Sequence, residues 1–204
     1  ELGRLWKKRG PFPGLGAVLA ASGVGLGHFV ANALIDEVGE EANPWPAWDS
    51  VLKDPTKHLP KELADQIDAT IAKSWQRLPK DRRAFLELLS RIAVTAPQAE
   101  FLFSPESRAD GGIEASDSEF VRNPYLFYEA TRLTRTPVSI GAVDRAVLPA
   151  AFVRERFPIP EPTTVKTAVD ARRLRALTIR ELENAASDGN TLLETWSSLV
   201  NPGI

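Results

Sequence analysis

The chain has 204 residues, 43% of them hydrophobic, so it is long and apolar enough to bury a core, as one large domain or two small ones. Its 25 basic and 27 acidic side chains nearly cancel, which excludes the strong overall field that holds some proteins on nucleic acid or on anionic membranes. Cysteine is absent, which excludes disulfides, thiol catalysis and thiolate metal sites, and fits a reducing compartment.

Two further features bear on the origin and location of the chain. Methionine is absent even at position 1, so the chain is either an excised piece of a larger protein, which we favour, or one whose selenomethionine residues are missing from the written sequence. The most apolar stretch, residues 17–35, is interrupted by glycines and polar side chains and falls short of the roughly 20 continuous apolar residues of a membrane span. It lacks the layout of a signal peptide as well. We therefore expect a cytoplasmic protein.

The N-terminal part of the chain alternates turn signals with helix signals. A glycine- and proline-rich segment, residues 10–16, leads into an apolar helix that begins near Ala17. Asn43 followed by Pro44 predicts the cap and the first residue of a short helix that ends before Pro55. No stretch shows sustained strand-type alternation, so the predicted class is all-α.

The middle of the chain predicts two amphipathic helices joined by a short link. The first runs from Pro60 and is ended by Pro79, and the second begins at about Asp81, which is expected to cap it. Because the link is short, we expect the two helices to pack antiparallel. The apolar stripe of the first helix is Leu63, Ile67, Ile71, Trp75 and Leu78, and the second turns Phe85, Leu86, Leu88, Leu89 and Ile92 inward.

Further cap signals follow towards the C-terminus. Thr95 is predicted to cap a brief helix that includes Phe103, and the polar stretch 104–116 is expected to be an exposed loop. Ser116 starts another turn of helix, and Asn123 with proline at the next position restarts the chain as a helix.

The last part of the chain suggests a domain boundary. Asp170 is predicted to cap a helix that Gly189 ends, before a short extended piece at 191–193 and a last helix from Glu194. The preceding stretch is broken by prolines. We expect a helix-hairpin-helix-like domain over residues 1–136, a connector with short helices over 137–169, and over 170–204 the truncated start of a second small helical domain, winged-helix-like in kind.

Catalytic signatures are missing from the sequence. No glycine-rich phosphate loop ends in lysine and a hydroxyl residue, and the cluster 23–27 is better explained as a turn between helices. His28 and His58 lack the spacing of metal ligands, and no nucleophile elbow is present. We therefore expect no catalytic residue, no metal and no cofactor in this chain.

A glycine turn and a basic arm remain as candidates for binding. Pro13-Gly14-Leu15-Gly16-Ala17 has the form of a helix-hairpin-helix turn, whose exposed backbone N–H groups can bind a phosphate without reading sequence. The arm just upstream would add binding energy through counterion release. Alternatively, the glycines only permit a tight turn and the arm is a solvated leader. The candidate contacts to the DNA backbone are Gly14, Leu15, Gly16, Arg4, Lys7, Lys8 and Arg9.

Several segments, read in order, resemble the N-terminal region of RecD-like ATP-dependent DNA helicases, similar to the exodeoxyribonuclease V alpha subunit. Pro13-Gly14-Leu15-Gly16 resembles the early hairpin of that family, and Ile71-Ala72-Lys73-Ser74-Trp75 resembles the helix that closes its next hairpin unit. Residues 123–129 resemble its Asn-Pro-Tyr element, residues 143–145 its Ala-Asp-Arg element, and residues 180–193 the helix that leads to its Gly-His-Thr turn.

The chain also departs from the family pattern. Pro137-Val138-Ser139-Ile140 stands where the family shows a Gly-Ile-Gly hairpin, and Asn190 replaces the customary histidine, so the chain is similar to a divergent subgroup. The resemblance implies that ATP, magnesium, the hydrolase activity and the motor belong to a downstream part outside this chain. It also implies that this region contacts DNA or the motor domains, in the setting of DNA repair.

Two functions compete on these grounds. The first is a DNA-contacting accessory region, for single- or double-stranded DNA without sequence preference, which the glycine turn and the resemblance favour. The second is a module that docks on the motor or another protein through acidic residues 36–41 and exposed apolar or tryptophan side chains, which the balanced charge favours. Trp45, Trp48 and Trp75 themselves lie at helix positions where burial is expected rather than base stacking. An independent small-molecule enzyme would need a convergent polar pocket that the sequence does not indicate.

Overall fold

The computed structural model describes residues 10–39 and 42–189, and all regular secondary structure within these ranges is helical. The predicted all-α class is therefore confirmed. The helices are α2 (Leu15–Ala21), α3 (Gly27–Val38), α4 (Pro44–Val51), α5 (Pro55–His58), α6 (Lys61–Ala64), α7 (Ala69–Gln76), α8 (Lys80–Arg91), α9 (Ala96–Phe103), α10 (Pro105–Asp110), α11 (Asp117–Arg122), α12 (Leu126–Thr131), α13 (Ile140–Val147), α14 (Ala151–Arg156) and α15 (Ala171–Ser187).

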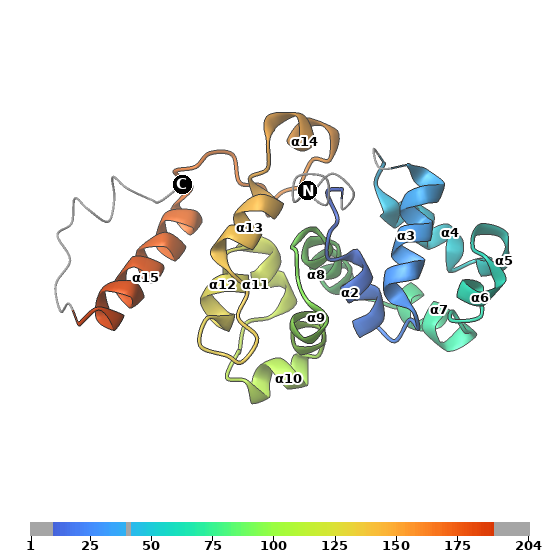
Figure 1. The fold of residues 1–204 in the computed structure, drawn as a ribbon, viewed down its shortest axis with the longest axis horizontal. Helices are drawn as coiled ribbons and strands as arrows, with labels where there is room; N and C mark the ends of the chain where they lie inside the picture. Colours follow the sequence, from blue (N-terminus) through green and yellow to red (C-terminus); the bar gives the residue numbers. More distant parts are fainter. Residues whose placement is uncertain (1–9, 40–41, 190–204) are drawn as a thin grey trace.

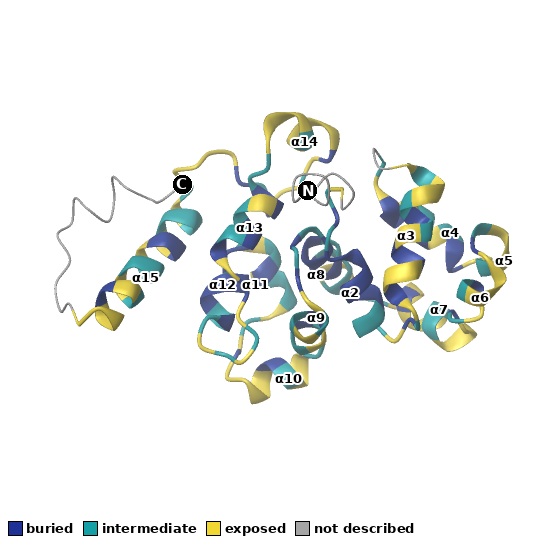
Figure 2. Cartoon of the chain, viewed as in Figure 1, coloured by how far each residue is buried: buried dark blue, intermediate teal, exposed yellow. Residues whose placement is uncertain are grey.

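The short helix α2 lies at the centre of the packing. It contacts α3, α8 and α9, while α8 also packs on α11, and α12 contacts both α13 and α15 (Figure 1). Helices α3 to α7 occupy one end of the elongated molecule and α15 the other. Five of the seven residues of α2 are buried, as its predominantly apolar sequence requires (Figure 2).

One apolar cluster extends from Phe12 to Leu177. Helix α13 belongs to it through five buried residues, although its sequence lies inside the predicted connector 137–169. The division of the chain into domains stays a prediction, but buried side chains of the same cluster lie on both sides of position 136.

The predicted helix from Pro60 to Pro79 is interrupted. It forms α6 and α7, because the Asp68 carboxylate accepts the backbone N–H groups of Thr70 and Ile71, both at 2.8 Å, and so begins a new helix. The apolar spacing continues through the break, so periodicity alone could not reveal it.

Helix α8 also differs from its prediction at its start. It begins after Pro79 without a side-chain cap, so Asp81 is not the cap. It packs on α2 and α11, and Arg83 places its guanidinium over the ring of Trp75 on α7. The antiparallel arrangement of the two helices stays a prediction. The five side chains predicted to face inward are all buried, at 0–4% exposure.

The predicted loop over residues 104–116 contains α10. The Ser104 side chain caps it by accepting the Ser107 N–H, and Pro105 occupies its first position. Arg108 from this helix is only 3% exposed and donates to Asp117 at 2.7 Å. The polar composition of residues 104–116 therefore did not indicate that Arg108 is buried.

The other caps largely follow the sequence. Thr95 and Ser116 each form a capping box, and Asp170 accepts the N–H of Arg172. The Asn123 side chain accepts the Tyr125 N–H, but α12 starts only at Leu126. Gly189 ends α15 with φ +78°. The elements predicted at 191–193 and from Glu194 lie outside the described residues.

Candidate functional site

The predicted phosphate-binding turn is buried. Gly14, Leu15 and Gly16 all lie inside the fold, and Leu15 is only 1% exposed. The Gly14 N–H already donates to the Ser90 carbonyl oxygen at 2.8 Å, and the Leu15 N–H donates to the Phe12 carbonyl oxygen at 3.1 Å. The N–H groups of Gly14 and Leu15 therefore already have partners within the fold.

Close packing explains the two glycines of this turn. A Cβ atom on Gly14 would lie 2.3 Å from the carbonyl oxygen of Ile92, and one on Gly16 would lie 2.8 Å from Cα of His28. Both neighbours are backbone atoms, so neither could move aside cheaply. The glycines allow α2 to approach the end of α8 and the start of α3.

The basic arm, with Arg4, Lys7, Lys8 and Arg9, lies outside the described residues. The first residue that the structure describes, Gly10, lines a cleft of about 850 Å³.

A second Gly-Leu-Gly sequence forms the turn between α2 and α3. This segment, Gly25-Leu26-Gly27, confirms the predicted helix-to-helix turn of the glycine cluster. Leu26 has φ +53° and is 51% exposed, and Phe29 in the first turn of α3 is 63% exposed.

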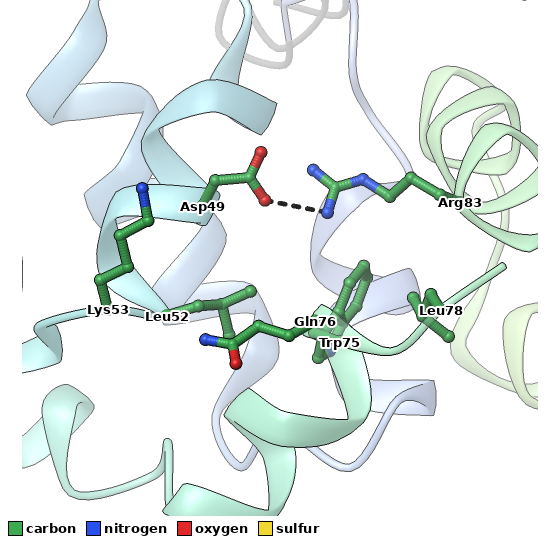
Figure 3. A pocket seen from close by; sticks show the side chains of 7 residues that line it. All are labelled: Asp49, Leu52, Lys53, Trp75, Gln76, Leu78 and Arg83. Atoms are coloured by element: carbon green, nitrogen blue, oxygen red, sulfur yellow. Dashed lines mark hydrogen bonds and ion pairs between the residues drawn. The ribbon is translucent and has the colours of Figure 1, made fainter. Parts of the chain in front are cut away.

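A hollow of about 360 Å³ lies between α4, α7 and α8 (Figure 3). Arg83 reaches across it to Asp49 at 2.9 Å and also contacts Glu87 at 2.8 Å. The same guanidinium lies over the rings of Trp45 and Trp75, which are buried as predicted. Two carboxylates balance the charge of Arg83, and two rings pack against the face of its guanidinium group. The charged groups around this hollow therefore have a structural role and need no ligand to explain them.

The cleft of about 850 Å³ is larger and differently charged. Its walls come from distant parts of the chain: residues 10–13, the end of α8, α13, α14 and the start of α15. Much of the lining is apolar, and the charged lining residues are Arg91, Arg145, Arg156, Arg173 and Asp144.

Arg91 is fixed in the wall of this cleft by neutral groups. Its guanidinium donates to the carbonyl oxygens of Phe157 at 2.9 Å and Pro158 at 3.3 Å, and lies over the ring of Phe12. Burial lowers the pKa of Arg91 to about 10. The charge of Glu87 acts on Arg91 in the opposite sense to burial, and the hydrogen bonds that hold the guanidinium group are made to carbonyl oxygens.

Asp144 is the acidic residue of the described lining, and it is already engaged. It accepts hydrogen bonds from Arg173 Nη2 at 2.9 Å and from the Tyr125 hydroxyl at 2.7 Å. Burial and the hydrogen bond to this carboxylate raise the pKa of Tyr125. The cleft therefore brings four arginines and one aspartate together in a chain whose net charge is −2.

Sequence reasoning did not single out this cleft. Of its charged residues, only Asp144 and Arg145 had been noted, through the family resemblance. Its walls combine residues from near both ends of the described chain, and no local pattern places them together.

The two histidines have other partners within the described part. His58 Nδ1 lies 2.6 Å from Glu37 Oε1, and His28 packs on Gly16. Residues 10–39 and 42–189 contain no group of three or more histidine, aspartate or glutamate side chains placed to hold a metal ion. None of their helices combines the length and the hydropathy needed to cross a membrane.

Comparison with known proteins yields no match to a family model, to a curated protein or to a solved structure.

Proposed function

We propose that this chain is a non-catalytic accessory region that contacts the DNA backbone without sequence specificity and supports an ATP-driven helicase motor located elsewhere in a longer protein. The observation that carries the proposal is the composition of the large cleft, whose lining brings four arginines and one aspartate together. Phosphate groups are the ligand that such a concentration of guanidinium groups favours.

The cleft replaces the glycine turn as the proposed DNA contact. Gly14, Leu15 and Gly16 are buried, whereas the cleft opens beside Gly10, directly after the basic arm in the sequence. Arg91 would bind without losing much conformational freedom, because two carbonyl groups and the ring of Phe12 already hold it. Contacts of this kind bind phosphates in any sequence and are sensitive to salt.

The helicase context rests on the resemblance of the sequence to RecD-like enzymes. In this proposal ATP, magnesium and the hydrolase activity belong to the motor, and this chain supplies a surface that the DNA passes. A phosphate loop encoded downstream of Ile204 in the parent gene would support this part of the proposal.

The experiment is a titration of labelled single- and double-stranded DNA at several salt concentrations. Arg145→Ala with Arg156→Ala should weaken binding and lower the slope of log K against log salt by about 1 for each phosphate that is no longer neutralised. Lys7→Glu with Lys8→Glu should weaken it as well. The matched control is Lys73→Ala with Arg77→Ala, two exposed cations on and beside α7, far from the cleft. Absence of binding at low salt, or an equal weakening in the control, would overturn the proposal.

A docking module remains the second candidate because Leu26 and Phe29 are both more than half exposed on the α2–α3 turn. Tryptophan does not contribute to such a surface at Trp45, Trp48 or Trp75, which are at most 4% exposed. If docking on the motor is the function, Phe29→Asp should abolish association with the motor domains. In that case neither the wild-type chain nor the Phe29→Asp variant should bind DNA.

A further inference from the structure

The last helix that the structure describes, α15, is joined to the rest of the fold mainly by charged and polar contacts. Three of its seventeen residues are buried, Ala176, Leu177 and Ala185, whereas the shorter helix α13 buries five of its eight. Helix α15 lies at one end of the elongated molecule and packs on α12 (Figure 1). Apolar burial therefore stabilises the position of α15 less than that of α13.

The first turn of α15 is firmly attached. The Arg173 guanidinium binds the Asp144 carboxylate through two nitrogen atoms, at 3.0 and 2.9 Å. The Arg172 guanidinium donates to three backbone carbonyl oxygens at 2.7–3.0 Å, those of Arg122, Pro162 and Thr164. Because these bonds reach several separate segments, the start of α15 is a fixed point.

The C-terminal half of α15 is attached through a different residue, Glu183. Its carboxylate accepts a hydrogen bond from the Tyr128 hydroxyl at 3.1 Å and from Arg132 Nε at 2.6 Å. The side chains of Arg132 and Glu183 are 31% and 38% exposed, so water and dissolved ions reach this ion pair. Ion pairs of this kind are screened by salt and stabilise only weakly.

A second ion pair, between Arg175 and Glu129, adds little to this attachment. Arg175 is 68% exposed, and its Nε lies 3.1 Å from Glu129 Oε2. The other oxygen of Glu129 is buried and has no hydrogen-bond partner in the described structure. Burying an ionised carboxylate that is only half satisfied costs free energy and offsets the attraction to Arg175. Glu183 is therefore the main polar attachment of the C-terminal half.

We propose that α15 is a hinged arm. Its first turn stays fixed through Arg172 and Arg173, while residues 178–187 detach from α12 when salt or a competing charged group breaks the contacts of Glu183. Detachment uncovers Tyr128 and Glu129, which are 8% and 4% exposed in the docked arrangement, and makes this side of α12 available to other molecules. This inference is independent of the proposed DNA contact.

Hydrogen exchange followed by mass spectrometry tests the proposal on the whole chain, at about 0.05 M and about 1 M sodium chloride. A detached segment of about ten residues is too short to stay helical in water, so its backbone amides exchange faster once it leaves α12. The amides of residues 178–187 should exchange faster at high salt. Those of α8, which has five buried residues, should not.

Glu183→Gln should have the same effect at low salt, because it weakens the contacts with both Tyr128 and Arg132. We expect exchange in residues 178–187 to rise by roughly 5- to 30-fold, the factor that corresponds to the loss of one or two hydrogen bonds. Arg132→Gln should also accelerate exchange, and combining it with Glu183→Gln should add little, since both substitutions remove the same contact.

The matched control is Glu181→Gln on the same helix. Glu181 forms its ion pair with Arg180, the preceding residue of α15, at 2.8 Å. The substitution therefore removes a charge and an ion pair without removing a contact to α12. It should leave the exchange of residues 178–187 close to that of the wild type.

A distance measurement distinguishes detachment from fraying of a helix that stays docked. The chain has no cysteine, so Asp188→Cys and Lys80→Cys, both at exposed positions, can carry one spin label each. High salt should broaden the distribution of distances between the labels, and Glu183→Gln should broaden it at low salt.

The proposal is overturned if salt changes neither the exchange of residues 178–187 nor the distance distribution, because apolar contacts would then hold α15 in place. It is also overturned if α8 accelerates by the same factor, which would show that α15 opens only when the whole chain unfolds. An effect of Glu181→Gln as large as that of Glu183→Gln would rule out Glu183 as the attachment. None of these results depends on whether DNA binds the large cleft.

Discussion

The carboxylate of Asp144 on α13 receives both sides of the Arg173 guanidinium fork, from Nε to Oδ1 at 3.0 Å and from Nη2 to Oδ2 at 2.9 Å. The Tyr125 hydroxyl donates to the same Oδ1. Arg173 lies in the first turn of α15, so one carboxylate joins the start of α15 to α13 and to the segment before α12. It also positions part of the wall of the large cleft.

Asp144→Ala should destabilise the protein by about 1–3 kcal/mol, because it leaves the Arg173 guanidinium and the Tyr125 hydroxyl without their acceptor. Urea unfolding measures the change, and hydrogen exchange should show increased opening of α15. Asp36→Ala, an exposed aspartate on α3, is the control and should change stability little. An equal destabilisation in the control would contradict the role assigned to Asp144.

Gly14→Ala should lower the free energy of unfolding by about 1–3 kcal/mol, because its Cβ would overlap backbone carbonyl oxygens at 2.3 and 2.9 Å. Gly141→Ala is the matched control within α13. Its new methyl group would meet only the tip of the Arg145 side chain at 3.3 Å, so it should be neutral or stabilise by about 0.4–1 kcal/mol. The free energy of unfolding, measured with heat and with urea, should change in opposite directions in the two variants or by clearly different amounts. Equal changes would count against close packing at Gly14.

Glu129→Gln should stabilise the chain increasingly as the pH rises above about 4.5, the ordinary pKa of a glutamate side chain. Burial raises the pKa of Glu129, Arg175 contacts one of its oxygens at 3.1 Å, and the other has no hydrogen-bond partner. The folded state therefore binds the proton of the Glu129 carboxyl group more tightly than the unfolded chain does. The stability that this proton contributes is fully present below the ordinary pKa of 4.5, and it is lost as the pH rises through the raised pKa of the folded state.

The measurement for Glu129 is the free energy of unfolding in urea at several pH values, for the wild type and the glutamine variant. The difference between them should grow with pH. Glu114→Gln, at an exposed position, is the control and should give a small difference. A constant difference for Glu129→Gln across the range would show that ionisation of this carboxyl does not oppose folding.

Ser90→Ala should cost about 1–3 kcal/mol, because the Ser90 hydroxyl accepts the Trp45 indole N–H at 3.2 Å inside the core. Ser74→Ala on the exposed side of α7 should be neutral or slightly stabilising, since alanine favours helix. Near-ultraviolet circular dichroism of the tryptophans would report the altered environment of Trp45. No destabilisation relative to Ser74→Ala would show that the indole finds another acceptor.

Local signals in the sequence predicted much of the secondary structure. Side chains that cap a helix act within three residues, so Thr95, Ser116 and Asp170 could be identified without the fold. The break at Asp68 was missed because the apolar spacing continues across it. The helix at 105–110 was missed because polar composition was given more weight than the Ser104-Pro105 start signal.

The candidate site was predictable only in part. Gly14 and Gly16 were correctly recognised as special, but a glycine needed for close packing and a glycine that exposes its amide look alike in a sequence. The cleft depends on tertiary contacts, such as that between Arg91 and Phe157, which no local spacing reports.

The walls of the large cleft include residues 10–13 at the beginning of the described chain and Arg173 in its last helix. A ligand bound between them contacts two segments that are far apart in the sequence. These segments lie side by side only in the folded protein, so the ligand binds the folded state. Occupancy must therefore raise resistance to heat: a ligand at a hundred times its Kd would add about 2.7 kcal/mol to the free energy of unfolding. A melting curve recorded along a ligand titration would register such an occupant without any knowledge of its chemistry.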